Sequence, residues 1–552
     1  MYNDRRTLFR SLAALGIGGT TFQRALASEI TQQPRASAVT AEMVKNAEWI
    51  AGITLSDDER AMVARRMGGI VSGFAAIRKQ PLTNDVSPAL TFIPLAAPVP
   101  PGTPRGTVEA ISAPIPSKPD SSDELAFLPL TSLASLVRTK KVSSYDLTKL
   151  YLDRLKKYDP KLLCVVSLTE ELAMKQAKRA DAEIAAGKYR GPLHGIPWGA
   201  KDLIAVPGYK TTWGAEHYKD QTFDVTATVA KKLEAAGAVL VAKLTLGALA
   251  MGDRWFGGQT RSPWDPKQGS SGSSAGPASA SAAGLVGFAI GTETRGSIVS
   301  PCRQCHVSGL RPTFGRISRY GCMALSWSMD KLGPIARSLE DCALVFGAIH
   351  GADGKDLAAV DRPFSWPAAK PLKDVKVGVF DNTPKAELDV LKTLGVQTVP
   401  VKLPAGFPIQ AIGVTLDVEC SAAFDELSVH GIKEGYGTGW PSTFRTAQFV
   451  SAVQYVQAQR ARTLLMRAME TMLEKVDCYI GGGNLELSLT NLTGHPTIVC
   501  PNGFRKQTRG GVETEVPLAV TFTGRLYGET DLLAVGHAYQ QVTGHHLKRP
   551  KL

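Results

Sequence analysis

The sequence predicts an α/β fold: one large domain with a mixed central β-sheet covered by helices on both faces, preceded by a small N-terminal helical extension. Short runs of β-branched or apolar residues alternate with amphipathic helical stretches along the chain. The clearest example is a helical stretch over residues 226–236 that leads into the apolar run 238–242. Further strands are expected at 285–290, 375–380 and 478–480, and further helices at 143–158 and 170–186.

The first 27 residues have the features of an export signal. A twin arginine, Arg5-Arg6, precedes a short stretch of small and apolar residues, and a small-x-small sequence follows at residues 25–27. This order is typical of signals that are read by the twin-arginine route, and the apolar stretch is too short to span a bilayer. We therefore expect export to the periplasm and no membrane span in the mature protein.

Three further segments follow the signal. Residues 28–79 form the helical extension, in which residues 41–51 are one expected helix and Ser56 with Glu59 fits a capping box at the start of the next. Residues 80–124 contain ten prolines and are expected to form a linker or a surface strap. The main domain occupies residues 125–552.

The chain is basic, with a formal net charge of +13 over 552 residues. A basic balance can draw a protein to nucleic acid. The lysines are dispersed, however, and form no cationic tract interleaved with aromatic residues. We therefore expect no nucleic-acid partner.

A stretch of small residues extends from residue 268 to residue 309. It opens with the glycine- and serine-rich residues 269–276, continues through the apolar run 280–290 and reaches Gly-Thr-Glu-Thr-Arg-Gly-Ser at 291–297. A Gly/Ser tract on its own is typical of a flexible linker. Because the following apolar run must be buried, we instead expect amides and hydroxyls packed closely around a site.

Lys201 is a candidate general base. It ends a Pro- and Gly-punctuated apolar stretch at residues 191–200, and lysine is rarely buried without a reason. A serine hydroxyl is a poor nucleophile until a base removes its proton. A lysine can do so only when neutral, so burial must bring its pKa, ordinarily about 10.4, down by roughly 2–3.

These motifs resemble those of the amidase signature family over about residues 125–552. The matching stretches are residues 195–201, 272–276, 291–297, 309–318, 330–334 and 491–496. The resemblance implies a Ser-Ser-Lys triad in which Lys201 is the base, Ser273 is a bridging serine in a cis peptide, and Ser297 is the nucleophile. It also implies that no metal or organic cofactor is needed.

The turn before the proposed nucleophile supplies candidate oxyanion donors, the amides of Thr294, Arg295, Gly296 and Ser297. Here the sequence departs from the family, because Arg295 replaces the first glycine of the usual Gly-Gly-Ser. Its side chain either recognises an acidic substrate or faces away into a salt bridge.

Substrate contacts are expected in segments that vary within the family, here including residues 251–258 and 419–455. Met251, Trp255 and Arg295 are the candidates that we name. Four aromatic residues would suit an apolar pocket, but core packing explains them equally well: Trp255, Phe256, Trp440 and Phe444.

Two other motifs compete with this interpretation. Residues 272–276 fit the G-x-S-x-G elbow of α/β-hydrolases with Ser274 as nucleophile, but a loop precedes them where that motif requires a strand. Residues 302–306 spell the c-type haem attachment pattern, but they lie in the expected core just beyond Ser297. We interpret Cys302 and Cys305 as a disulfide or as two buried thiols. The histidines show no metal-ligand spacing, and no phosphate-binding loop occurs.

The expected reaction is hydrolysis of a carboxamide, with an ester or carbamate as further substrates, to an acid plus ammonia or amine through an acyl-serine intermediate. One alternative is the A-type subunit of a tRNA-dependent amidotransferase, which would feed ammonia to a partner; the export signal argues against it. Another is a catalytically silent binding protein on the same scaffold. The expected partner is a small-molecule amide, and the oligomeric state stays open, with a homodimer among the states considered.

Overall fold

The computed structural model describes residues 39–77, 79–80, 90, 106–113, 117–481, 483–509 and 512–552. The chain divides into two compact units, Met1–Ala76 and Ile77–Leu552. The predicted export signal, residues 1–27, lies outside the described residues, as does most of the proline-rich segment 80–124. The signal and the three boundaries between the four predicted segments therefore stay predictions.

The first unit contains two described helices, α3 (Ala41–Ala51) and α4 (Asp57–Ile77). The last residue of α4, Ile77, is the first residue of the second unit. Arg60 of α4 pairs with Glu48 of α3 at 2.7 Å. At the start of α4, the Ser56 amide donates to the Glu59 carboxylate at 2.8 Å, which is one half of the predicted capping box. The Ser56 hydroxyl donates to the same oxygen at 2.9 Å. The bounds predicted for α3 are confirmed.

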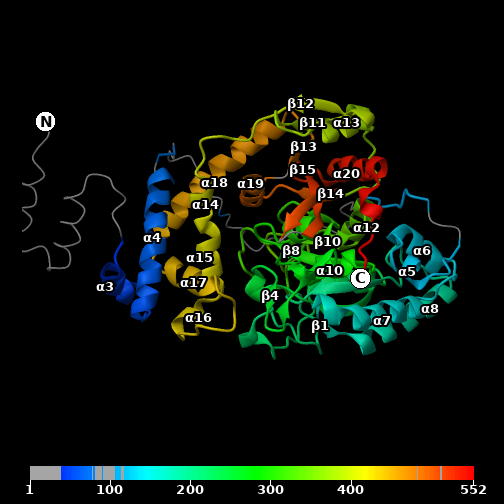
Figure 1. Cartoon of the computed structure of the whole chain (residues 1–552), viewed down its shortest axis with the longest axis horizontal. Coiled ribbons are helices and arrows are strands. Elements are labelled where there is room, and N and C mark those ends of the chain that lie inside the picture. Colours follow the sequence, from blue (N-terminus) through cyan, green and yellow to red (C-terminus); the bar gives the residue numbers. More distant parts are fainter. Residues whose placement is uncertain are drawn as a thin grey trace, which may run out of the picture. The chain divides into compact units, whose positions relative to one another are not determined.

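The second unit is built on a mixed sheet of eleven strands (Figure 1). In spatial order the strands are β1 (Val165–Leu168), β3 (Val239–Leu244), β2 (Pro197–Lys201), β8 (Phe288–Glu293), β10 (Lys331–Ala336), β9 (Ser308–Arg311), β14 (Thr497–Arg509), β15 (Val512–Gly524), β13 (Cys478–Gly481), β11 (Lys376–Val379) and β12 (Gln397–Pro400). Two small hairpins lie outside this sheet, β4 (Arg254–Trp255) with β5 (Gly258–Gln259), and β6 (Arg261–Ser262) with β7 (Asp265–Gly269).

The α-helices of the second unit connect and cover these strands. They are α5 (Ser122–Ala126), α6 (Leu130–Arg138), α7 (Ser144–Leu162), α8 (Glu170–Ala185), α9 (Thr228–Ala235), α10 (Ala275–Ala282), α11 (Val299–Cys305), α12 (Leu339–Ile349), α13 (Lys385–Thr393), α14 (Ile409–Ile412), α15 (Val414–Ala423), α16 (Asp425–Val429), α17 (Trp440–Ala447), α18 (Ala452–Leu473), α19 (Asn484–Thr493) and α20 (Glu529–Thr543). Helices α7 and α8 lie side by side, and α20 packs on β14 and β15 (Figure 1). None of the described helices combines the length and apolarity that a membrane crossing requires.

Apolar side chains are buried on both faces of the sheet. In β8, Phe288 and Ile290 belong to one buried apolar cluster and Ala289 belongs to another. Because successive side chains of a strand point to opposite faces, helices must cover the sheet on both sides. The predicted α/β fold, with its mixed sheet and its helical layers, is confirmed.

The predicted strand bounds differ from the observed ones mainly at β8. The apolar run 285–290 was expected to be strand, but β8 begins at Phe288 and continues to Glu293. The Leu285 amide instead donates to Ala280 O at 2.9 Å and so ends helix α10. Strand β2 runs parallel to β8, which brings their carboxyl ends to one edge of the sheet. Lys201 ends β2 there, and the turn that carries Ser297 follows β8.

Candidate active site

Lys201 is fully buried at the end of β2, and hydroxyl groups surround its amine. Nζ donates to Ser273 Oγ at 2.8 Å, to Thr292 Oγ1 at 2.8 Å and to Ser274 Oγ at 3.2 Å. Burial lowers the pKa of Lys201 to about 7, against the opposing effect of the carboxylates of Asp330 and Glu293. A fraction of the amine is therefore neutral near pH 7 and able to accept a proton.

Ser273 lies in the loop between β7 and α10, and the Gly272–Ser273 peptide is cis, as the family resemblance implied. A Cβ atom at residue 272 would lie 1.9 Å from the Gly252 carbonyl oxygen, so only glycine fits there. The next residue, Ser274, fixes the loop to β8: its hydroxyl accepts from the Thr292 amide at 3.1 Å and donates to Thr292 O at 3.0 Å. The serine loop and β8 are thus held in register beside Lys201.

Ser297 lies in the turn that follows β8. Its carbonyl oxygen accepts from the Ser274 amide at 3.0 Å, which brings its backbone against the serine loop. Throughout the described ranges, the Ser297 hydroxyl makes no hydrogen bond, so the expected contact with the Ser273 hydroxyl is not formed. Hydrogen bonds between catalytic groups are often long or misaligned before substrate binds.

The turn from residue 294 to 297 leaves its amides unused. Among the described residues, the N–H groups of Thr294, Arg295, Gly296 and Ser297 donate no hydrogen bond. Gly296 has a φ of 113°, a conformation that residues with a Cβ rarely adopt. Unpaired amides clustered before a serine could donate hydrogen bonds to a developing oxyanion.

Arg295 is exposed, and its guanidinium forms no ion pair with any residue that the structure describes. Its Nη1 lies 3.4 Å from the point that a Cβ atom on Gly413 would occupy, at the junction of α14 and α15. The salt bridge that we considered for this side chain is therefore not formed within the described part of the chain.

The two other candidate substrate contacts lie in the segment that follows β3. The backbone of Met251 is adjacent to Gly252, the residue in contact with Gly272, and the Met251 side chain is exposed. Trp255 is half-buried and packs edge-on against Phe256, with its indole N–H unpaired in the described structure. Trp440 and Phe444, by contrast, are buried and stacked at 5.2 Å, so they pack in the core.

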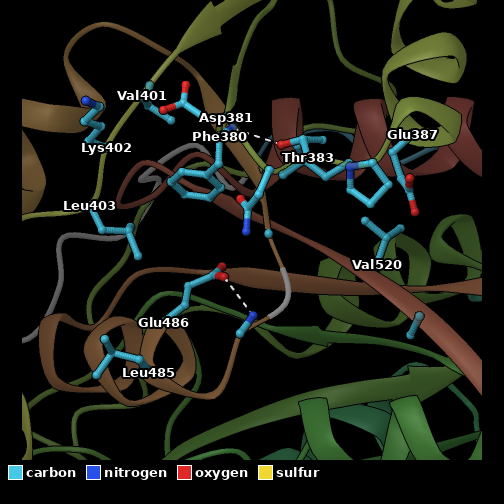
Figure 2. Close-up of a pocket in the computed structure, with 16 residues that line it drawn as sticks. Phe380, Asp381, Thr383, Glu387, Val401, Lys402, Leu403, Leu485, Glu486 and Val520 are labelled. Atoms are coloured by element: carbon cyan, nitrogen blue, oxygen red, sulfur yellow. Dashed lines mark hydrogen bonds between the residues drawn. The ribbon is translucent and has the colours of Figure 1, made fainter.

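A cavity of about 720 Å³ lies at the carboxyl ends of β11, β12 and β13 (Figure 2). None of the proposed triad residues lines this cavity. Helix α19, however, lines the cavity and also packs against the Ser297 turn. Leu485 and Glu486 of α19 line the cavity, and the Glu486 carboxylate accepts from the Gly483 amide at 3.2 Å (Figure 2). The following residue, Leu487, would lie 2.9 Å from a Cβ atom on Gly296. This cavity is therefore a neighbour of the site and not its catalytic pocket.

Cys302 and Cys305 are free and buried on α11. Their sulfur atoms face backbone carbonyls, Cys302 Sγ at 3.8 Å from Ser308 O and Cys305 Sγ at 3.7 Å from Ser270 O. Of the two interpretations of this pair, a disulfide or two buried thiols, the structure agrees with two buried thiols. No group of three or more His, Cys, Asp or Glu side chains within the described ranges is arranged to hold a metal ion.

Two residues of this site, Thr292 and Glu293, were not singled out from the sequence, and Ser274 was named there only as the nucleophile of the competing hydrolase motif. Thr292 accepts from Lys201, Ser274 joins the serine loop to β8, and the Glu293 carboxylate accepts from an amide just beyond Ser297. All three lie inside the two motifs that indicated the triad. Their proximity to it in the sequence was the available signal, but a hydroxyl or carboxylate in a motif does not reveal its partner.

Comparison with known proteins identifies the family. A family model described as Amidase matches residues 146–482. The chain belongs to the amidase family. This amidase is 32% identical over 490 residues to the A subunit of the glutamyl-tRNA(Gln) amidotransferase of Coxiella burnetii (strain RSA 493 / Nine Mile phase I), covering 77% of this chain and 99% of the relative. The corresponding protein of Moorella thermoacetica is 31% identical over 492 residues, with shares of 78% and 99%.

Solved structures agree with this assignment. The native peptide amidase from Stenotrophomonas maltophilia superposes with a TM-score of 0.65 at 28% identity, covering 76% of this chain and 98% of that one. An amidase family protein from Bacillus anthracis str. Ames superposes with a TM-score of 0.67 at 25% identity, with shares of 78% and 94%. As a member of this family, the amidase acts on amide C–N bonds.

Proposed function

We propose that this amidase hydrolyses a carboxamide through an acyl-Ser297 intermediate, with Lys201 as general base and Ser273 as the proton relay. The observation that carries the proposal is the 2.8 Å contact between Ser273 and the buried amine of Lys201. A base must lie within hydrogen-bond reach of the proton that it takes, and its pKa should be close to the working pH. Lys201 meets both conditions with respect to Ser273.

Each step uses groups of this chain, the substrate and water. Ser297 Oγ attacks the carbonyl carbon while its proton passes to Ser273, whose own proton passes to neutral Lys201. Amides of the turn 294–297 donate to the oxyanion. On collapse, Ser273 gives a proton to the leaving nitrogen and recovers one from Lys201, and the C–N bond breaks. Water, deprotonated through the same relay, then hydrolyses the acyl ester and restores the Ser297 hydroxyl.

The direct test is active-site labelling with a fluorophosphonate, followed by peptide mapping. We expect one label, on Ser297, no label in Ser297→Ala, and labelling slowed at least about 100-fold in Lys201→Ala. Ser300→Ala is the matched control, because it removes a half-buried hydroxyl three residues away. Wild-type labelling of Ser297→Ala, or a label on Ser274, would refute the assignment.

This chemistry could serve either of two kinds of protein: a stand-alone amide hydrolase, or the A-type subunit of an amidotransferase. The names of the curated relatives favour an A-type amidotransferase subunit, with 32% identity over nearly their whole length. The peptide amidase of S. maltophilia, at 28% identity, supports a stand-alone hydrolase. The two differ in what the purified chain can do. Turnover of peptide, aliphatic or aryl amides by the chain alone supports a stand-alone hydrolase, whereas activity that appears only with a co-purified partner protein supports the amidotransferase.

We also propose export through the twin-arginine route. Export would distinguish a stand-alone hydrolase from an amidotransferase subunit, which acts in the cytoplasm. Its support is the Arg5-Arg6 pair with the apolar stretch and small-residue sequence that follow. Cell fractionation with intact-mass analysis tests it. We expect the amidase in the periplasm without its first 27 residues; a full-length chain in the cytoplasm would overturn export and favour the amidotransferase.

We also assign the substrate an acidic group. The support is Arg295, which is exposed on the turn of the proposed nucleophile and forms no ion pair in the described part of the chain. Arginine binds carboxylates through paired N–H donors, so a carboxylate on the substrate would give this side chain the partner that it lacks.

A further inference from the structure

Glu293 is a buried carboxylate that the proposed proton relay does not use. It is the last residue of β8 and is completely inaccessible to solvent. One oxygen accepts from the amides of Ile298 and Val299, at 2.8 and 2.9 Å. These are the two residues that follow Ser297. The carboxylate therefore closes a short loop from residue 293 to residue 298, and the candidate oxyanion amides and Ser297 all lie within that loop.

The other oxygen of Glu293 is held by side chains from distant parts of the chain. Arg311 Nη1 of β9 and Asn491 Nδ2 of α19 each donate to it at 2.7 Å. Arg311 is itself fixed, because its Nη2 also donates to His495 O at 2.7 Å. With four donors the carboxylate is fully satisfied, although it is buried.

The ionised state of Glu293 follows from these contacts. Burial alone would raise the pKa of Glu293, but the Arg311 guanidinium and the turn amides outweigh it and bring the pKa to about 2. A negative charge beside an oxyanion would oppose catalysis unless a cation neutralised it. Arg311 is fully buried and 2.7 Å away, so it supplies that neutralisation.

Helix α19 reinforces the same loop at a second point. Asn491 reaches Glu293, and one turn earlier Leu487 lies against Gly296. The Asn491 amide group also donates to Leu487 O at 2.9 Å, which fixes its orientation. The loop is thus held at its ends by the carboxylate and at Gly296 by a helix.

We propose that Glu293 is the positioning residue that sets the geometry of the Ser297 turn, and that Arg311 and Asn491 hold it in place. Amides aimed at an oxyanion contribute most when they are fixed before the reaction, and a supporting shell of hydrogen bonds fixes them. This inference rests on the proposed role of Ser297.

The test compares Glu293→Gln with Asp341→Asn in steady-state kinetics and thermal unfolding. Asp341 is the matched control, because it is equally buried and accepts a backbone amide, that of Leu130 at 2.8 Å, outside the site. For Glu293→Gln we expect kcat to fall about 100-fold, the size of a lost oxyanion donor, with KM changed less than about threefold. Asp341→Asn should leave kcat within about threefold of wild type.

Asn491→Ala provides a second variant in case Glu293→Gln does not fold, since it removes one donor and leaves the charge pair with Arg311. We expect a smaller loss of kcat there, and no additional loss when the two substitutions are combined, as in a unit that acts together. A folded Glu293→Gln with kcat within about threefold of wild type would overturn the inference. Ser297→Ala would still be inactive and unlabelled in that case, so the two proposals fail separately.

Discussion

Lys201 Nζ lies 2.8 Å from Ser273 Oγ, and no carboxylate pairs with the amine in the described residues. Most buried lysines have an anionic partner, which keeps them charged. Here the partners are neutral hydroxyls, so desolvation dominates and the pKa of Lys201 falls to about 7. The absence of a partner charge is what makes this lysine usable as a base.

The first prediction concerns the pH dependence of kcat/KM. Because the neutral form of Lys201 is the base, activity should rise with pH through a single ionisation near 7 and level off above it. The measurement is kcat/KM on a non-ionisable amide between pH 5 and 9, which gives the acidic limb of the pH profile. A flat profile across that range would contradict the role of Lys201, and so would a limb that persists unchanged in Lys201→Ala.

The second prediction uses Asp330, whose negative charge raises the pKa of Lys201. Asp330→Asn removes that charge, so the acidic limb should move to lower pH. Asp330 also accepts from the Thr294 hydroxyl at 2.6 Å, so the maximal rate will fall as well. The position of the limb is therefore the readout. A shift toward higher pH would show that Asp330 does not act on Lys201 through its charge.

The third prediction concerns Arg295. If its guanidinium binds a substrate carboxylate, Arg295→Gln should raise KM for a carboxylate-bearing amide by up to about tenfold, a modest value because the residue is exposed. KM for the uncharged isostere should not change. Equal effects on both substrates would show that Arg295 shapes the turn and does not select the substrate.

The fourth prediction concerns the ion pair between Lys243 and Asp202. Nζ and Oδ1 are 2.7 Å apart, and both side chains are fully buried. Lys243→Met leaves the Asp202 carboxylate without its cation and should lower the free energy of unfolding by roughly 3–5 kcal/mol. Urea unfolding measures the loss. Lys385→Ala is the control, because its pair with Asp389 is exposed and should contribute nothing measurable.

The fifth prediction distinguishes thiols from disulfides. All eight cysteines are free, and seven are buried, with Cys322 half-buried. Burial raises the pKa of Cys302 and Cys305, which makes their thiols poor nucleophiles. A chromogenic thiol reagent should react with at most Cys322 in the native protein and with eight thiols after denaturation without reductant. Six thiols in the denatured chain would reveal a disulfide.

Local sequence was sufficient to predict many of the helices and the motifs of the family. The periodicity of apolar residues placed helices such as α3 and α8 to within one residue, because each helix buries one face and exposes the other. The motifs around Lys201, Ser273 and Ser297 pointed to the family because their glycines and small residues are required by close backbone packing, as the contact of Gly272 with Gly252 illustrates.

The tertiary structure alone decided which groups meet. Lys201 is partly uncharged near pH 7 because β2 and β8 bury it among hydroxyls, and burial is a property of the whole sheet. The side-chain partners of Glu293 come from β9 and α19, and Asn491 is 198 residues away in the chain. Local propensity carries no information about contacts at such a separation, because they form only when the sheet and its helices pack together.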